Sequence, residues 1–275
     1  MSVTLPEWPR INNRAGCAAF AAFAVAVSAI VPVAGPVAGA AAAELAAHRA
    51  TYDLSLGSLR SGSEIADVRG TLAFSLSDAC DGWTVEERYQ LRFLYPAGDE
   101  VEMATTFVTW EAKDGGAYRF NFRKVVNGEV EEEMRGEADA GAGVVRYARP
   151  EGDELALPPG VAFPTAHTIA LIDEAKSGGK FLSAMVFDGS DAGGWTEIGA
   201  AIGLGRTAEA GEAGALTGGS FWPVRMAFFP PDAQEAAPDY EMEIDLLENG
   251  VARSVLVDYG GFTVSATLRE VEALP

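Results

Sequence analysis

The chain has 275 residues, 40 of them acidic and 20 basic, and its formal net charge is −20 at neutral pH. A surface with this charge repels nucleic acid, phosphate groups and anionic lipid headgroups, so a nucleic-acid-binding function is excluded. With only two cysteines, the chain is not a small domain held together by a disulfide framework.

The start of the chain has the features of an export signal. Arg10 and Arg14 give it a positive charge, and residues 15–33 form an almost continuous apolar run. Small residues then offer a cleavage site after Ala40, and a second one follows Ala43. We therefore predict a cleaved Sec-type signal peptide and a mature protein in the periplasm of a Gram-negative bacterium.

The alternative is that this segment remains as a transmembrane anchor. Pro32, Pro36 and the Ala/Gly-rich stretch around them make a weak membrane span, so we expect no stable anchor. Cleavage leaves residues 44–275, a length that suits one large β-domain. Since residues 1–43 carry two arginines and one glutamate, the mature protein stays strongly acidic.

From residue 52 onward, apolar and polar residues alternate with a period of two, which is typical of half-buried β-strands. The pattern predicts strands around residues 72–76, 83–95, 118–123 and 240–246. One face of the strand at 83–95 belongs to a core and the other to solvent. The first face carries Trp83, Val85, Tyr89, Leu91, Phe93 and Tyr95, and the second carries Thr84, Glu86, Arg88, Gln90 and Arg92.

Turn signals separate these strands. Asn127-Gly128 and Asn249-Gly250 favour type I′ hairpins, in which both central residues take positive φ. Residues 114–116 form a third turn signal. Strands joined by such tight turns are antiparallel neighbours.

One segment departs from the strand pattern. The run from Thr165 to Ser177 places Ile169, Ile172 and Ala175 at helical spacing, with Thr165 as the expected N-cap and Gly178 as the stop. About twelve to fourteen strands with this one helix predict an all-β, mainly antiparallel barrel or large curled sheet rather than a sandwich. Such a helix packs across an open end or a gap.

Cys80 is the only thiol once Cys17 has left with the signal peptide, so it has no partner within its own chain. We expect it to be a small, buried apolar residue. The alternative is an exposed thiol that links two copies of the chain in an oxidising compartment.

Catalytic or metal chemistry would depend on His167, because the other histidine, His48, stands next to the cleavage site. A Ser/His/Asp hydrolase also needs a nucleophile elbow, and no G-x-S-x-G sequence occurs. Asp188, Gly189 and Ser190 predict a tight turn rather than a calcium loop, which needs more oxygen ligands. The sequence therefore predicts no catalytic residue, metal or cofactor, and we expect His167 to hold a nearby loop by a hydrogen bond.

Trp83, Trp110, Trp195 and Trp222 lie on or beside predicted strands, and in a curled sheet some of them line the interior. Most buried tryptophans belong to a core. An open barrel too wide to be filled by side chains instead keeps a cavity for apolar or extended ligands. We expect such a ligand pocket here.

Five short motifs, spread over nearly the whole predicted mature chain, occur together; we call them the family motifs. They are His48 to Leu54 (HRATYDL), Cys80 to Trp83 (CDGW), Thr109 to Glu111 (TWE) with Asp114-Gly115, Leu157 to Gly160 (LPPG) with Phe163 to Thr168 (FPTAHT), and Val186 to Ser190 (VFDGS). In this order they resemble the EipB family of periplasmic cell-envelope-integrity proteins. The resemblance implies an open, spiral-like β-barrel with a packed helix, a role in envelope integrity and no established enzymatic reaction. The pocket or structural positions that it marks are Cys80, Asp81, Gly82, Trp83, Trp110, Glu111, Pro164, Thr165, His167, Phe187, Asp188 and Gly189.

The chain departs from this family at its tail. The family pattern pairs the cysteine of the Cys-Asp-Gly-Trp motif with one near the C-terminus, but residues 268–275 contain no cysteine. We therefore expect no intramolecular disulfide. Its stabilisation, typically about 2 to 4 kcal/mol, must come from packing or be absent.

The leading hypothesis is a non-enzymatic periplasmic protein that supports envelope integrity by binding a peptide, a lipid or a protein partner in or on the barrel. One alternative is a carrier of lipids or lipoproteins, which needs an apolar cavity of acyl-chain width. Another is a hydrolase of envelope polymers that uses His167. A dimer linked through Cys80 is the alternative to a monomer.

Overall fold

The computed structural model describes residues 44–191, 193–231 and 237–275. The predicted signal peptide, both predicted cleavage sites and Cys17 lie outside the described residues. The described part contains fifteen strands, one α-helix and one short 3-10 helix. The number of strands exceeds the expected twelve to fourteen because very short strands of three residues, such as β8 and β11, were not apparent from alternation.

The element bounds, in chain order, are as follows. The strands are β1 (His48–Leu59), β2 (Asp67–Asp78), β3 (Gly82–Leu94), β4 (Glu100–Ala112), β5 (Ala117–Val126), β6 (Glu129–Asp139), β7 (Val144–Arg149), β8 (Glu154–Ala156), β9 (Phe181–Val186), β10 (Thr196–Ile202), β11 (Arg206–Ala208), β12 (Gly219–Phe229), β13 (Tyr240–Leu247), β14 (Ala252–Asp258) and β15 (Phe262–Ala273). The helices are α1 (Pro164–Ser177) and η1 (Ala215–Thr217).

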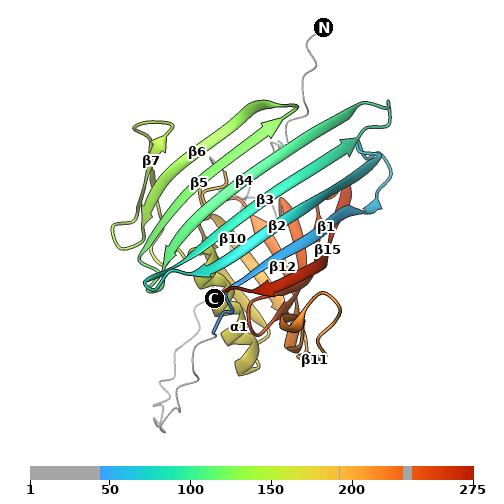
Figure 1. Cartoon of the computed structure of the whole chain (residues 1–275). Helices are drawn as coiled ribbons and strands as arrows, with labels where there is room; N and C mark the ends of the chain where they lie inside the picture. Colours follow the sequence, from blue (N-terminus) through green and yellow to red (C-terminus); the bar gives the residue numbers. More distant parts are fainter. Residues whose placement is uncertain (1–43, 192, 232–236) are drawn as a thin grey trace, which may run out of the picture. The chain divides into compact units, whose positions relative to one another are not determined.

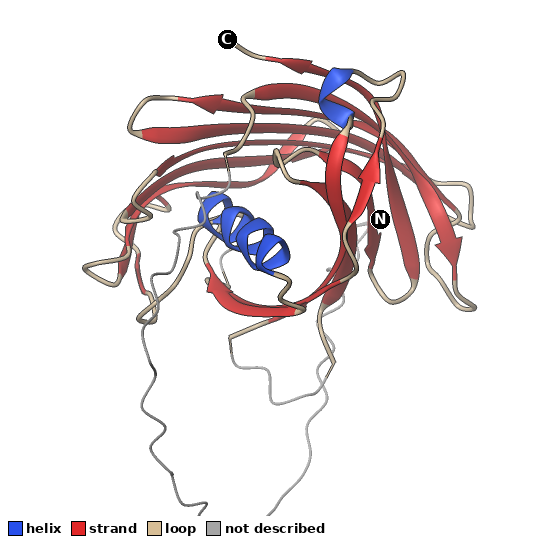
Figure 2. Ribbon diagram, turned by 90° about the horizontal axis from the view of Figure 1, so that it is seen from below, coloured by secondary structure: helices blue, strands red, loops and turns tan. Residues whose placement is uncertain are grey.

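All the strands belong to one sheet, and each pair of neighbours within it is antiparallel. Its order is β8-β7-β6-β5-β4-β3-β2-β1-β15-β14-β13-β12-β10-β9, and β11 pairs with β12. β1 and β15 lie side by side, so the two ends of the described chain meet in the middle of the sheet (Figure 1). The sheet curls around α1, and its edges β8 and β9 are not paired with each other (Figure 2). The prediction of an all-β, open and mainly antiparallel barrel is confirmed.

Cross-strand register carries the alternating pattern around the curl. Leu72 of β2 lies opposite Tyr89 of β3, which lies opposite Thr105 of β4, and the three side chains share the inner face. The outer face of the same strands carries charged residues, such as Arg92 and Glu102, which form an ion pair at 2.9 Å. Alternation thus gives this sheet an apolar concave face and a polar, solvent-exposed convex face.

Helix α1 begins one residue earlier than expected, and its N-cap is Phe163 rather than Thr165. Phe163 has no side-chain oxygen to cap the helix. The carboxylate of Glu111, on β4, does so instead: it accepts hydrogen bonds of 2.7 Å from the backbone N–H groups of Thr165 and Ala166. The predicted stop at Gly178 is confirmed, since this residue is left-handed with a φ of 87°.

The apolar face of α1 packs onto the inner face of the sheet. Leu171, Ile172 and Ala175 are buried in a cluster with residues of β9, β10, β12 and β13, among them Val186 and Ile198. Burying this face fixes the helix inside the curl, as expected for a helix that closes part of an open barrel.

One of the two predicted type I′ turns is confirmed. Asn127 and Gly128 take φ values of 49° and 85°. At Asn249-Gly250 only Gly250 has a positive φ, and its N–H donates to the carbonyl of Leu247, so the hairpin uses a longer turn that ends in a left-handed glycine. Asn249 is held differently, because its side-chain amide donates to the carbonyl of Leu216 at 3.0 Å.

Replacing Glu111 by Ala tests the cap. Two N–H groups at the helix start lose their acceptor in a largely buried place, so we expect the free energy of unfolding in urea to fall by about 2 to 4 kcal/mol. The matched control is Glu137→Ala, on the exposed outer face, which should change it by less than about 0.5 kcal/mol. Equal losses in the two variants would show that the helix does not depend on Glu111.

Candidate functional site

The family motifs converge at one end of the sheet, although they are far apart in sequence. The cross-strand register runs from His48 through Leu76 and Val85 to Thr109 and Phe120. The start of β1, the β2–β3 turn, the end of β4 and the start of α1 therefore lie close to one another. The structure thus brings together the sites predicted from the sequence.

The β2–β3 turn is packed against the end of β4. A side chain at Gly82 would overlap the indole of Trp110 and the carbonyl of Glu111, so only glycine fits there. Lys113 pairs with Asp78 at 2.7 Å, and its ammonium lies 4.8 Å from the ring centre of Trp83.

Cys80 differs from the expectation, because it is exposed rather than buried. It takes a φ of 63° at the tip of the turn, and its N–H donates to the Asp78 carboxylate at 2.9 Å. Tight turns run over the surface, so the geometry of the turn overrides the apolar character of the thiol. Asp81, next to it, is also exposed, and its carbonyl accepts the N–H of Lys113 at 3.0 Å.

The turn after β9 packs against β5. The hydroxyl of Tyr118 donates to the carbonyl of Asp188 at 2.7 Å, and a side chain at Gly189 would overlap the ring of Phe120. Tyr118 also stacks on Phe163 at 4.9 Å, and Phe187 packs edge-on against Tyr118. The Asp188 carboxylate accepts bonds from the N–H and hydroxyl of Ser190, as expected of a tight turn.

His167 is buried, and its Nε2 has no hydrogen-bond partner among the described residues. We expected the His167 side chain to hold a nearby loop by a hydrogen bond, and within the described residues Nε2 makes none. Burial lowers the pKa of His167 to about 4, which keeps the imidazole neutral. Because no nucleophile lies within hydrogen-bonding distance of Nε2 in the described segments, the triad geometry of a hydrolase is not formed there.

A different region, the middle of the inner face, stays partly exposed. Large apolar side chains there face the inside of the curl and are only partly buried. We call this region the open inner face. Its members are Leu72, Phe74, Val85, Tyr89, Leu91, Phe93, Met103, Phe107, Tyr240 and Met242.

Glu87 lies within the open inner face and was not among the site residues predicted from the sequence. Its cross-strand neighbours are Phe74 and Phe107, and the hydroxyl of Tyr89 donates to its carboxylate at 3.2 Å. Burial raises the pKa of Glu87 from 4.5 to about 7, and the negative charge of Asp188 adds to the rise. None of the ion pairs between described residues involves Glu87. The available signal was the position itself, since an acid at 87 interrupts the face of Trp83, Val85 and Tyr89.

These features define a class: an open, curled antiparallel barrel with a helix inside the curl, the family motifs packed together at one end and an apolar inner face. The model of the EipB-like family matches residues 39–275, so this chain belongs to the EipB-like family. The chain is 30% identical over 233 residues to the "Cell envelope integrity protein EipB" of Brucella abortus (strain 2308), covering 82% of this chain and 83% of that protein. It is also similar to the crystal structure of a beta-barrel-like protein with a domain of unknown function from Brucella abortus, with a TM-score of 0.80 and 29% identity over 85% of this chain and 100% of the other.

Both relatives are named for a fold or an envelope role and not for an enzymatic activity. The family resemblance inferred from the five motifs is confirmed. Within the described residues, no helix is both long and apolar enough to cross a membrane.

The pKa of Glu87 predicts a pH dependence of stability. Because the folded protein holds this proton up to about pH 7 and the unfolded chain releases it near its ordinary value of 4.5, the stability should fall as pH rises through this interval. Glu87→Gln should flatten that part of the curve and be more stable than wild type above about pH 7. The matched control is Glu86→Gln, on the opposite face of the same strand. Thermal unfolding across the pH series is the measurement, and an unchanged slope in Glu87→Gln would refute the assignment.

The exposed position of Cys80 predicts a reactive surface thiol. In a Cys17→Ser background, the native protein should react with a disulfide reagent such as DTNB at a rate close to that of the urea-unfolded chain. A thiol that reacts only after unfolding would contradict the structure.

Proposed function

We propose that this chain is a periplasmic, non-enzymatic protein that supports the integrity of the cell envelope by binding an apolar segment of a peptide or protein partner on the open inner face. The observation that carries the proposal is a row of large apolar side chains that face inward and are only partly buried. Burying such side chains against a ligand is favourable, at about 25 cal/mol per Å² of apolar surface. The export signal predicted at residues 1–43 and the name of the Brucella relative support the compartment and the envelope role.

The charge of the open inner face favours a peptide over an anionic lipid. The negative charge of Asp188 acts on Glu87, whose pKa of about 7 leaves it partly ionised at neutral pH, and the chain as a whole carries a net charge of −20. The carboxylate of a fatty acid or the phosphate of a phospholipid would be repelled at this place, whereas a peptide presents neutral amides and can add a basic side chain. A carrier of lipids or lipoproteins is therefore the second candidate, supported by the apolar surface alone.

A hydrolase that uses His167 is disfavoured by the burial of this side chain. The imidazole is buried in the first turn of α1, its Nε2 has no hydrogen-bond partner among the described residues, and its low pKa suits a packed residue. Residues 44–275 would then act as one binding domain.

Native mass spectrometry of the protein isolated gently from the cells that produce it tests the proposal. We expect a reproducible additional mass that fragments as a peptide or protein. A lipid fragment would support the carrier instead, and a clean chain without ligand would contradict binding on the inner face. Measuring with and without reductant also reports a Cys80-linked dimer, which should disappear on reduction and in Cys80→Ser.

Matched variants locate the bound mass. Phe107→Ala, in the open inner face, should lose most of it, while Phe181→Ala, whose side chain is exposed at the sheet edge, should keep it. Far-ultraviolet circular dichroism of both variants controls for folding. Equal retention would move the binding site away from the inner face.

A further inference from the structure

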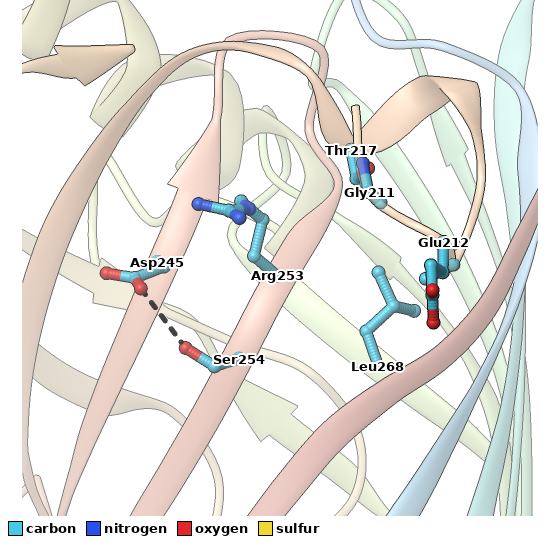
Figure 3. A pocket seen from close by; sticks show the side chains of 8 residues that line it. Gly211, Glu212, Thr217, Asp245, Arg253, Ser254 and Leu268 are labelled. Atoms are coloured by element: carbon cyan, nitrogen blue, oxygen red, sulfur yellow. Dashed lines mark hydrogen bonds between the residues drawn. The ribbon is translucent and has the colours of Figure 1, made fainter. Parts of the chain in front are cut away.

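A recess lies among β13, β14, β15 and the segment that joins β11 to β12 (Figure 3). Its volume is about 280 Å³. We call it the Arg253 pocket. Its lining residues are Gly211, Glu212, Ala213, Thr217, Asp245, Arg253, Ser254 and Leu268.

A β-bulge turns Arg253 toward this pocket. Ile244 pairs with Val255 and Leu246 pairs with Ala252, so Asp245 alone stands opposite both Arg253 and Ser254. A bulge of this kind re-aims a side chain that regular pairing would send to the other face of the sheet. Arg253 and Ser254 therefore line the same pocket although they are adjacent in sequence.

The guanidinium of Arg253 has no carboxylate partner within ion-pair distance in the described part of the chain. It lies 4.9 Å from the ring centre of Phe221, which holds it by a cation–π contact. Arg225, on β12, shows the usual alternative: it pairs with Glu241 at 2.9 Å and with Glu243 at 3.3 Å. In so acidic a chain, a half-buried arginine without an ion pair keeps donors available for a ligand.

The segment that borders the pocket is held in place by hydrogen bonds. The hydroxyl of Thr217 accepts the N–H of Gly211 and donates to the carbonyl of Gly214, both at 2.7 Å. The N–H of Val271, on β15, donates to the carbonyl of Ala213 at 2.7 Å. The pocket wall is thus preorganised, which lowers the entropy cost of binding.

The lining charges have both signs, and this selects the ligand. Glu212 and Asp245 bring carboxylates, and the hydroxyl of Ser254 donates to Asp245 at 3.3 Å. An inorganic anion would meet both carboxylates, and a simple cation would meet Arg253. We propose that the Arg253 pocket binds a small zwitterion, an amino acid or a short peptide, whose carboxylate pairs with Arg253 and whose ammonium pairs with Asp245 or Glu212. The volume, at the small end of ligand sites, fits this class.

Calorimetric titration of the full chain with alanine, alanyl-alanine and trialanine tests the proposal. At least one of these probes should bind saturably. N-acetylation or C-terminal amidation of the tightest binder should each weaken binding about tenfold or more, because each removes one charge. Arg253→Gln should weaken it to a similar degree, while the control Arg225→Gln should leave it unchanged.

A second variant covers the case in which Arg253→Gln is too unstable to titrate. Glu212→Gln, on the exposed part of the bordering segment, should weaken binding of the free peptide but not binding of its N-acetylated form. The proposal is overturned if none of the three probes binds, if the amidated peptide binds as tightly as the free acid, or if Arg253→Gln and Arg225→Gln behave alike.

Discussion

The pair of hydrogen bonds between Glu111 and the start of α1 is the constraint on which the packing of the family motifs depends. Glu111 lies 54 positions before Thr165 and 55 before Ala166 in the sequence. Each oxygen of its carboxylate accepts a hydrogen bond from one of their N–H groups, and the helix has no other side-chain cap. A helix N-terminus carries partial positive charge, so a carboxylate suits it better than a neutral acceptor. Burial raises the pKa of Glu111, while the two N–H groups oppose that rise. The stack of Tyr118 on Phe163 is positioned by the same bonds, because Phe163 is the N-cap.

The family motifs and the open inner face differ in how deeply their side chains are buried. The motif residues Glu111, Phe163 and Phe187 are at most 2% exposed, so a partner cannot reach them unless the side chains around them move. Phe74 and Phe107, in the middle of the same sheet, are only partly buried. The family motifs are therefore explained by the fold that they hold together. The binding proposed for this chain involves a different set of residues, the partly buried inner-face positions that lie outside the motifs in sequence.

Period-two alternation predicts strands correctly here because most strands are wet on one side and apolar on the other. It fails where a distant residue decides the outcome. Thr165 has the chemistry of an N-cap, but Glu111 supplies a charged acceptor from another strand and the helix starts earlier. Cys80 looks apolar in composition, yet its turn needs an exposed, left-handed residue. The Arg253 pocket depends on a bulge, which is a property of paired strands and has no signature in either strand alone.

The tail of the chain is held by strand pairing and packing. β15 pairs with β1 along nearly its whole length, Val271 is buried, and the N–H of Leu274 donates to the carbonyl of Ala47 at 2.9 Å. The exposed ion pair of Arg49 with Glu272 adds little to this. Many weak contacts along two long strands therefore hold the C-terminus in the middle of the sheet. Because Cys80 is a free thiol among the described residues, this hold on the tail is non-covalent.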